Sequence, residues 1–150
     1  MKPLAGVRII SIEQFGAAPY GSMFLADLGA EVIKVENLAI GGDPARKTGP
    51  FFLGEDDSEY FQTWNMNKKS VSLDLRSDEG KAALTRLVES AEVVMNNLRG
   101  DLAAKMGIDY AALSKVKRSS GSSWNPRWCS ITFAEIFPRR WASTTRRSRN

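Results

Sequence analysis

The 150-residue sequence contains no histidine and a single cysteine, Cys129. Without histidine the chain cannot supply a Ser-His-Asp or Cys-His catalytic site, nor a histidine-based metal site, and we expect no metal cofactor. One cysteine excludes an internal disulfide framework. No stretch approaches the roughly 18 apolar residues of a membrane-spanning helix, and the first residues lack the apolar core of a signal peptide. We therefore expect no membrane partner and a cytoplasmic location.

Acidic residues are scarce at the end of the chain. Residues 117–150 hold eight Lys or Arg and one acid, Glu135, a net charge of +7. Since the whole chain has a formal net charge of +4, residues 1–116 carry −3. The body is mildly acidic, so the basicity of the whole chain is no argument for a nucleic-acid partner, and we expect none.

Residues 117–150 also lack Leu, Val and Asp, and they hold seven Ser, seven Arg and three of the four Trp. One interpretation is a basic interaction tail. The other, which we favour, is translation out of frame, because such a composition is rare in packed domains. Residues 125–127 and 129–132 fit remnants of a loop and a strand. The sequence thus predicts a domain at 1–116 and an irregular tail at 117–150.

The beginning of the chain has the pattern of two parallel strands joined by a helix. A β-branched strand is expected at about residues 7–12, and a second at residues 31–36. Between them, Gly16 opens a compact turn, Pro19 suits a first helical turn, and Gly29 suits the position just after a helix. Such a unit places backbone N–H groups at the start of its helix, which favours phosphate binding.

The rest of the body continues this alternation. We expect a long loop over residues 37–58, a short helix at 60–64, and a strand at 70–75 whose alternation puts Val71, Leu73 and Leu75 on one face. Ser77 is a good N-cap for the next helix, and a short strand follows at 93–95. Short helices are expected at 102–106 and after Asp109. The predicted fold class is α/β, a Rossmann-like parallel sheet with flanking helices, truncated.

Polar or small residues follow each predicted strand, namely Gly16, Asn37, Arg76 and Asn97. Ligands bind beyond the carboxyl ends of strands in open parallel sheets, so these residues are expected to meet at one edge. Residues 16–21 are an altered dinucleotide fingerprint, with Glu36 about 20 residues on, where a ribose-binding acid would lie. A NAD-binding Rossmann oxidoreductase fragment is therefore an alternative. Lys68 and Lys69 could hold phosphates, but a pair of lysines is more often solvated surface, and we interpret them so.

Six runs of residues match a known family in order and spacing. They are residues 3–8 (PLAGVR), 26–36 (ADLGAEVIKVE), 42–46 (GDPAR), 67–75 (NKKSVSLDL), 91–94 (AEVV) with Asn97, and 106–110 (MGIDY). With these runs, residues 3–116 resemble the N-terminal portion of class III acyl-CoA transferases, the family of formyl-CoA and carnitine CoA-transferases. The resemblance implies a CoA-binding Rossmann-like domain and, in the full-length family, an intertwined homodimer.

Carried over by position, the resemblance implies coenzyme A contacts at Gly16, Ala17, Asn37, Leu73, Asp74, Leu75, Arg76, Asn97, Leu98, Arg99 and Lys105. Two positions depart from the family pattern. Asn37 stands where the family often has a basic residue, and Leu98 replaces the more usual aromatic residue.

The family reaction transfers CoA from an acyl-CoA to a carboxylic acid through an aspartyl intermediate, which divides one acyl transfer into easier steps. The resemblance places that aspartate beyond Val116, in a Gly-Tyr-Asp motif, but no Asp follows Asp109 in this chain. We therefore assign no catalytic residue and expect these 150 residues to form an inactive fragment with at most residual CoA affinity. A nucleic-acid binder that uses residues 117–150 is the third hypothesis, and its binding would fall steeply with salt.

Overall fold

A computed structural model describes residues 1–98, 100–119 and 127–130 of the chain. In chain order the elements are β1 (Arg8–Ile12), α1 (Ala17–Asp27), β2 (Glu31–Asn37), the 3₁₀ turns η1 (Leu38–Ile40) and η2 (Pro44–Lys47), β3 (Phe52–Gly54), β4 (Asp57–Ser58), α2 (Glu59–Asn65), β5 (Lys69–Leu73), α3 (Asp78–Glu89), β6 (Val93–Asn96), α4 (Gly100–Lys105), α5 (Tyr110–Ser119) and β7 (Arg127–Ser130). The predicted alternation of strands and helices is confirmed.

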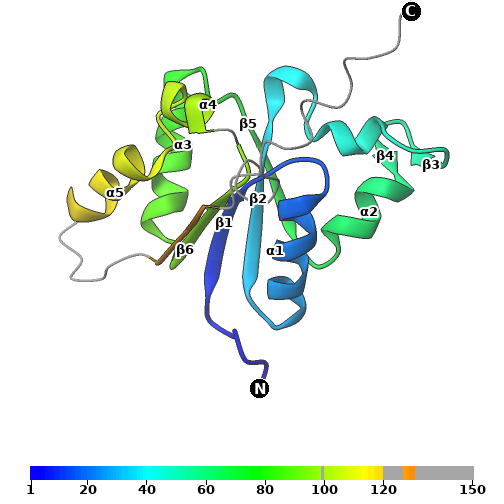
Figure 1. The fold of residues 1–150 in the computed structure, drawn as a ribbon, viewed down its shortest axis with the longest axis horizontal. Coiled ribbons are helices and arrows are strands. Elements are labelled where there is room, and N and C mark those ends of the chain that lie inside the picture. Colours follow the sequence, from blue (N-terminus) through cyan, green and yellow to red (C-terminus); the bar gives the residue numbers. More distant parts are fainter. Residues whose placement is uncertain (99, 120–126, 131–150) are drawn as a thin grey trace, which may run out of the picture.

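The main sheet has the order β5-β2-β1-β6-β7, and every neighbouring pair in it is parallel. In register, Ile10 of β1 lies between Ile33 of β2 and Val94 of β6. The strand order places the first strand at the centre and the later ones outward on both sides. Figure 1 shows the strands running side by side, with their carboxyl ends at the top of the view. The Rossmann-like α/β fold class is confirmed.

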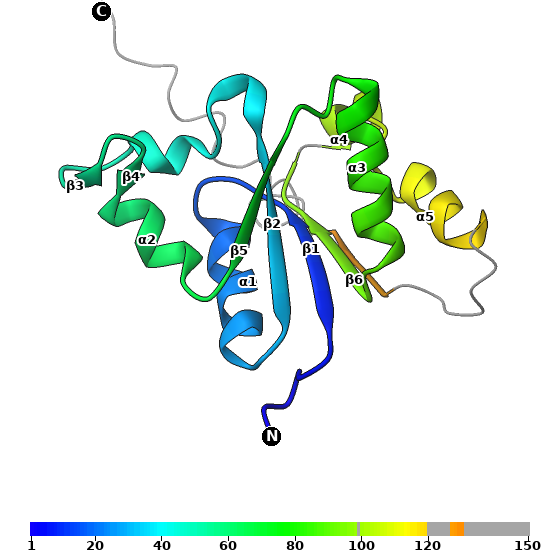
Figure 2. The same cartoon turned by 180° about the vertical axis from the view of Figure 1, so that it is seen from behind.

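Helices cover both faces of this sheet. Helix α1 lies in front of the strands in Figure 1, and α3 comes to the front when the molecule is turned by 180° in Figure 2. The alternation of side chains along the strands therefore supplies two apolar layers. Ile10, Val35 and Val94 belong to the larger layer, with Leu84 and Val88 of α3. The smaller layer contains Ile9, Val32 and Met95 with Ala26 of α1.

Helix α1 packs mainly through small side chains and Met23, and it exposes its aromatic side chains. Ala18, Ser22 and Ala26 are buried, whereas Tyr20 and Phe24 are each about half exposed, at 47%. Tyr20 and Phe24 form an edge-on pair with ring centroids 4.8 Å apart. The helical spacing of these aromatic residues thus comes from an outward face of the helix rather than from the core.

The helix ends lie where the capping residues of the sequence predict them. Gly29 has φ +103°, and an added Cβ would lie 2.5 Å from Lys2 Cβ, so only glycine fits there. Ser77 caps α3, because its Oγ accepts a hydrogen bond from Gly80 N–H at 3.0 Å. Asp109 likewise accepts from Ala112 N–H at 3.1 Å at the start of α5.

The connection after β2 is more ordered than the long loop that the sequence predicts. It contains η1, η2 and the antiparallel pair β3–β4, in which Phe52 pairs with Ser58. The hairpin is exposed at Phe51, Phe52 and Leu53. Strands of two and three residues show no alternation, which explains why the pattern did not predict them.

Regular structure also continues past Val116. Helix α5 runs to Ser119, and β7 pairs with β6 in the register Val94↔Trp128 and Asn96↔Ser130. The strand coincides with part of the segment considered as a loop and strand remnant. Backbone pairing does not depend on side-chain type, so a strand forms there despite the unusual composition. The remaining residues of 117–150 lie outside the described part. Among the described residues, no helix combines the length and apolarity needed to cross a membrane.

Candidate functional site

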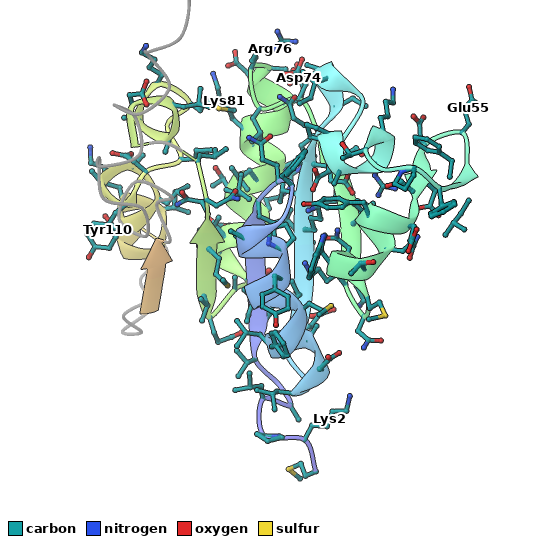
Figure 3. The ribbon with its side chains drawn as sticks, turned by 45° about the vertical axis from the view of Figure 1, so that its right-hand side comes forward. Lys2, Glu55, Asp74, Arg76, Lys81 and Tyr110 are labelled. Carbon is teal, nitrogen blue, oxygen red and sulfur yellow. The ribbon has the colours of Figure 1, made fainter. Side chains whose placement is uncertain are left out.

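The carboxyl edge of the sheet carries the four predicted residues that follow its strands. Strands β1, β2, β5 and β6 are parallel, so the residues that follow them emerge at the same edge. Figure 3 shows Asp74, Arg76 and Lys81 at this edge, whereas Lys2 lies at the opposite end of the molecule. The expected meeting of Gly16, Asn37, Arg76 and Asn97 at one edge is confirmed.

A cavity of about 170 Å³ opens at this edge. Its apolar walls come from the carboxyl ends of β1 and β2, from η1, from the segment after β5 and from the segment around α4. Its polar walls come from the end of β2 and from the residues that follow β1 and β2. The lining residues are Ile12, Glu13, Gln14, Val35, Glu36, Asn37, Ile40, Gly42, Asp43, Leu75, Leu98, Leu102 and Met106. An apolar pocket with a few convergent polar groups is the usual form of a small-molecule site.

Three of the predicted contact residues line this cavity, namely Asn37, Leu75 and Leu98. Leu75 is buried at 3% exposure and forms part of the floor. The Asn37 side chain caps η1, since its Oδ1 accepts from Ala39 N–H at 3.0 Å. Leu98 packs against the larger apolar layer. These residues give the cavity its shape rather than its charge.

Leu73, Asp74 and Arg76 do not line the cavity, although Leu75 of the same segment does. Leu73 ends β5 and packs against the larger apolar layer. The Asp74 carboxylate accepts hydrogen bonds from the backbone N–H of Arg76 at 3.0 Å and from Arg76 Nε at 3.3 Å. These two hydrogen bonds, in that order, hold the pKa of the Asp74 carboxyl below its usual value. The Arg76 side chain is 72% exposed, so its guanidinium remains open to a ligand.

Gly16 and Ala17 stand at the start of α1. Gly16 is the N-cap residue, and no side chain caps this helix. An added Cβ at Gly16 would lie 3.2 Å from the Tyr60 hydroxyl, which explains the small residue. Neither residue lines the cavity, although Glu13 and Gln14 of the same turn do.

Lys105 is not brought to the first cavity. It lines a second groove of about 340 Å³ between α3, α4 and α5, together with Lys81. Met106 belongs to both, so the groove and the cavity are neighbours. Arg99 lies outside the described residues.

Asn97 has its side chain occupied by the turn after β1. Its Nδ2 donates to the Gln14 carbonyl at 2.9 Å, and its Oδ1 accepts from Gln14 N–H at 3.1 Å. The amide therefore ties the end of β6 to a cavity-lining residue. This double hydrogen bond makes Asn97 a brace of the cavity wall.

A buried ionic cluster that includes the cavity-lining residues Glu13 and Asp43 was not predicted. Lys34, at 1% exposure, lies with its Nζ 2.6 Å from Asp43 Oδ2. Lys68 Nζ donates to Glu13 Oε1 at 2.9 Å and to the Pro19 carbonyl at 2.8 Å. The interpretation of Lys68 as solvated surface is wrong, because burial among these acceptors keeps its ammonium group from water. This burial lowers the Lys68 pKa despite the nearby Glu13 carboxylate.

Glu36 is the centre of a second buried group. Its carboxylate accepts from Arg46 Nε at 2.8 Å and Nη2 at 2.7 Å, from Ser70 Oγ at 2.6 Å, and from Asp43 N–H at 2.9 Å. Burial alone would raise the Glu36 pKa, but these hydrogen bonds and the Arg46 charge outweigh it and lower the pKa to about 2. The Arg46 guanidinium also lies 3.8 Å from the centroid of the Phe61 ring.

Two signals in the sequence could have indicated this cluster. Lys34 and Glu36 interrupt an otherwise apolar strand, which is costly unless both are paired. The Gly41-Gly42-Asp43-Pro44 turn supplies the sharp return that brings an acid back to that strand, with φ +76° and +93° at the two glycines. Charged residues inside a buried strand therefore predict a partner nearby in the chain.

The parallel sheet with helices on both faces defines a Rossmann-like α/β domain, with a cavity at its carboxyl edge. The sequence profile of CoA-transferase family III matches residues 4–119. The chain belongs to this family. It is 41% identical over 137 residues to the succinate–glutarate CoA-transferase of Agrobacterium fabrum, and 38% identical over 116 residues to the succinyl-CoA:glutarate CoA-transferase of Mus musculus. These alignments cover 87% and 77% of this chain.

Solved structures give the same result. A CaiB/BaiF family protein from Brucella suis superimposes with a TM-score of 0.75 at 35% identity, over 87% of this chain and 33% of the other. Rv3272 from Mycobacterium tuberculosis gives a TM-score of 0.70 at 35% identity, over 87% of this chain and 33% of that protein. The chain spans about a third of the length of the Agrobacterium relative, at 32%, and 26% of the mouse protein.

Proposed function

We propose that this chain is the CoA-binding N-terminal portion of an acyl-CoA transferase, and that CoA binds at the carboxyl-edge cavity. The observation that carries the proposal is the division of chemistry at this edge. The cavity has apolar walls and the carboxylates of Glu13, Glu36 and Asp43, whereas exposed Arg76 lies outside it. Carboxylates repel phosphate, so the cavity suits an uncharged base and the outer edge suits phosphates.

The alternative of a NAD-dependent oxidoreductase requires a free acid at the end of the second strand to accept the ribose hydroxyls. Glu36 has no such freedom, because each of its carboxylate oxygens already accepts two hydrogen bonds within the protein. The altered glycine pattern of residues 16–21 also lacks the second glycine that lets a backbone approach a pyrophosphate. Both observations favour CoA over NAD.

Calorimetric titration of the 150-residue chain distinguishes these possibilities. We expect a heat of binding with CoA and none with NAD at the same concentration. Dephospho-CoA, which lacks the 3′-phosphate, should bind more weakly if exposed cations such as Arg76 hold that phosphate. Binding of NAD but not CoA would refute the proposal, whereas steeply salt-dependent binding of nucleic acid would favour the third hypothesis.

We further propose that the chain of 150 residues has no transferase turnover by itself. No Asp follows Asp109, so the aspartyl nucleophile implied by the family reaction is missing from it. An exchange assay between an acyl-CoA and carboxylic acids should show no product above the uncatalysed background. Sustained turnover by the purified chain would contradict this assignment.

For the whole protein we propose an acyl-CoA and a carboxylic acid as substrates, a homodimeric assembly and a cytoplasmic location. The substrates are supported by the activities named for the relatives. The assembly is supported by the exposed apolar side chains of Phe51, Phe52 and Leu53 and of the outer face of α1, since surfaces of this kind commonly contact another subunit. Light scattering after gel filtration of the longer protein would measure its mass directly.

We also propose a boundary at Val116 between the CoA-binding region and residues 117–150. The composition supports it, but the origin of the second part is open to a simple test. Because 87% of 150 residues exceeds 116, the alignment with the Agrobacterium relative includes part of residues 117–150. The nucleotide sequence after the Val116 codon would decide: a second reading frame that restores a family-like segment supports the out-of-frame interpretation.

A further inference from the structure

Phe15 adopts a backbone conformation that is unfavourable for its residue type. Its φ is +71°, and among the described non-glycine residues only Asn67 shares a positive φ. A bulky L-residue is disfavoured in this region because its Cβ is crowded by the backbone, so something outside the turn must hold it there. Phe15 lies between Gln14, which lines the cavity, and Gly16, which begins α1.

The Asp43 carboxylate supplies that restraint. Phe15 N–H donates to Asp43 Oδ1 at 3.0 Å and to Oδ2 at 3.2 Å, and Ala45 N–H donates to Oδ1 at 2.9 Å. The side chain of Asp43 is fully buried, and Lys34 Nζ lies 2.6 Å from its Oδ2. One carboxylate thus links the turn after β1 to the middle of β2.

Asp43 is itself fixed from its backbone side. Its N–H donates to Glu36 Oε2 at 2.9 Å, and the preceding Gly42 has φ +93°. A Cβ at Gly42 would lie 2.8 Å from Glu36 Oε2, so the loop can approach the strand only with glycine there. The restraint on Phe15 therefore comes from a rigid part of the molecule.

We propose that Asp43 is a positioning residue, which holds the turn at Phe15 so that Gln14 and Gly16 face a ligand correctly. The inference rests on the proposed CoA site. By this proposal Asp43 strengthens CoA binding through the turn that it holds, although its negative charge alone would weaken that binding. Acting only as a charge beside a polyanion, Asp43 would weaken CoA binding, and its removal would strengthen it.

The test measures CoA affinity by calorimetry in the 150-residue chain and in three variants. Asp43→Ala removes the restraint, and we expect CoA to bind at least about tenfold more weakly, since hydrogen bonds to a charged group are among the stronger ones. Asp43→Asn keeps an acceptor oxygen for Phe15 N–H, so an intermediate loss is expected. Asp56→Asn removes an exposed carboxylate that pairs with Lys47 and should bind CoA as the unmodified chain does.

Amide hydrogen exchange gives a second readout that a general loss of stability would not move selectively. In Asp43→Ala, a peptide that covers residues 13–17 should exchange faster, while peptides from β1 and β6 keep their protection. Unchanged or tighter CoA binding by a folded Asp43→Ala or Asp43→Asn variant would overturn the inference. If Asp43→Ala does not fold, Asp43→Asn decides. If the unmodified chain fails to bind CoA, the proposed function falls, and the exchange data alone decide whether Asp43 holds the turn.

Discussion

The strongest test of the buried polar network concerns how Glu36 contributes to the stability of the fold as the pH is lowered. The Glu36 pKa falls from 4.5 to about 2 in the folded chain, where the carboxylate accepts four hydrogen bonds. Because the folded-state pKa is lower than the unfolded value of 4.5, the ionised carboxylate stabilises the fold above pH 4.5. This stabilisation is lost as the pH falls toward 2. The difference corresponds to about 3 kcal/mol, of which about 2.5 kcal/mol is lost by about pH 2.5.

The perturbation is Glu36→Gln, which keeps the size of the side chain and removes its titration. At about pH 6 this variant should be less stable by about 2 kcal/mol or more, because Arg46 loses its charged partner. Between about pH 6 and pH 2.5 the unmodified chain should lose about 2.5 kcal/mol more stability than the variant. Urea denaturation followed by circular dichroism at several pH values measures both quantities.

Glu55→Gln is the matched control, because Glu55 is exposed in the β3–β4 hairpin (Figure 3). It should reproduce the pH dependence of the unmodified chain. If Glu36→Gln and the unmodified chain lose stability in parallel as the pH falls, Glu36 is not held ionised by its hydrogen bonds, and the reasoning fails.

Four further substitutions test the site and its support. Arg76→Glu should weaken CoA binding and reduce the dependence of that binding on salt. Lys105→Glu should have a smaller effect on both if the second groove holds no phosphate. Calorimetry at two salt concentrations measures the affinities. Gly80→Ala should destabilise the chain by about 2 kcal/mol or more, because its Cβ would lie 2.0 Å from the Asp74 carbonyl oxygen; thermal denaturation measures this, and an unchanged midpoint would contradict the packing described. Leu98→Asp should abolish CoA binding and also lower the stability of the fold, since it places a charge in the cavity wall and against the larger apolar layer; calorimetry and thermal denaturation measure the two effects.

Local patterns in the sequence predicted most of the fold. The alternation of Val71, Leu73 and Leu75 matches a single face that packs against the larger apolar layer. Ser77 begins α3 as its capping chemistry predicts. Each of these signals lies within a few residues of the element that it specifies, which is why sequence alone suffices.

The buried ion pairs beside the cavity could not be predicted from local patterns. Lys68 pairs with Glu13 and Lys34 with Asp43, and such contacts across the chain leave no periodic signal. The positions of Gly16, Asn37, Arg76 and Asn97 at one edge were predictable, because strand direction alone determines them. Which of these residues line the cavity depends on side-chain packing, and Lys105 shows that a position near the edge can belong to a neighbouring groove.

The charged side chains of β2 have a consequence for how the chain folds. Lys34 and Glu36 face the α1 side of the sheet, while Ile33 and Val35 face the larger apolar layer. A slip of one residue between β2 and its neighbours would turn both charges into that apolar layer, away from Asp43 and Arg46, at a cost of several kcal/mol for each unpaired ion. A β2 strand with apolar side chains at both of these positions would tolerate a shifted register far better. These ion pairs therefore favour the observed strand register over registers shifted by one residue.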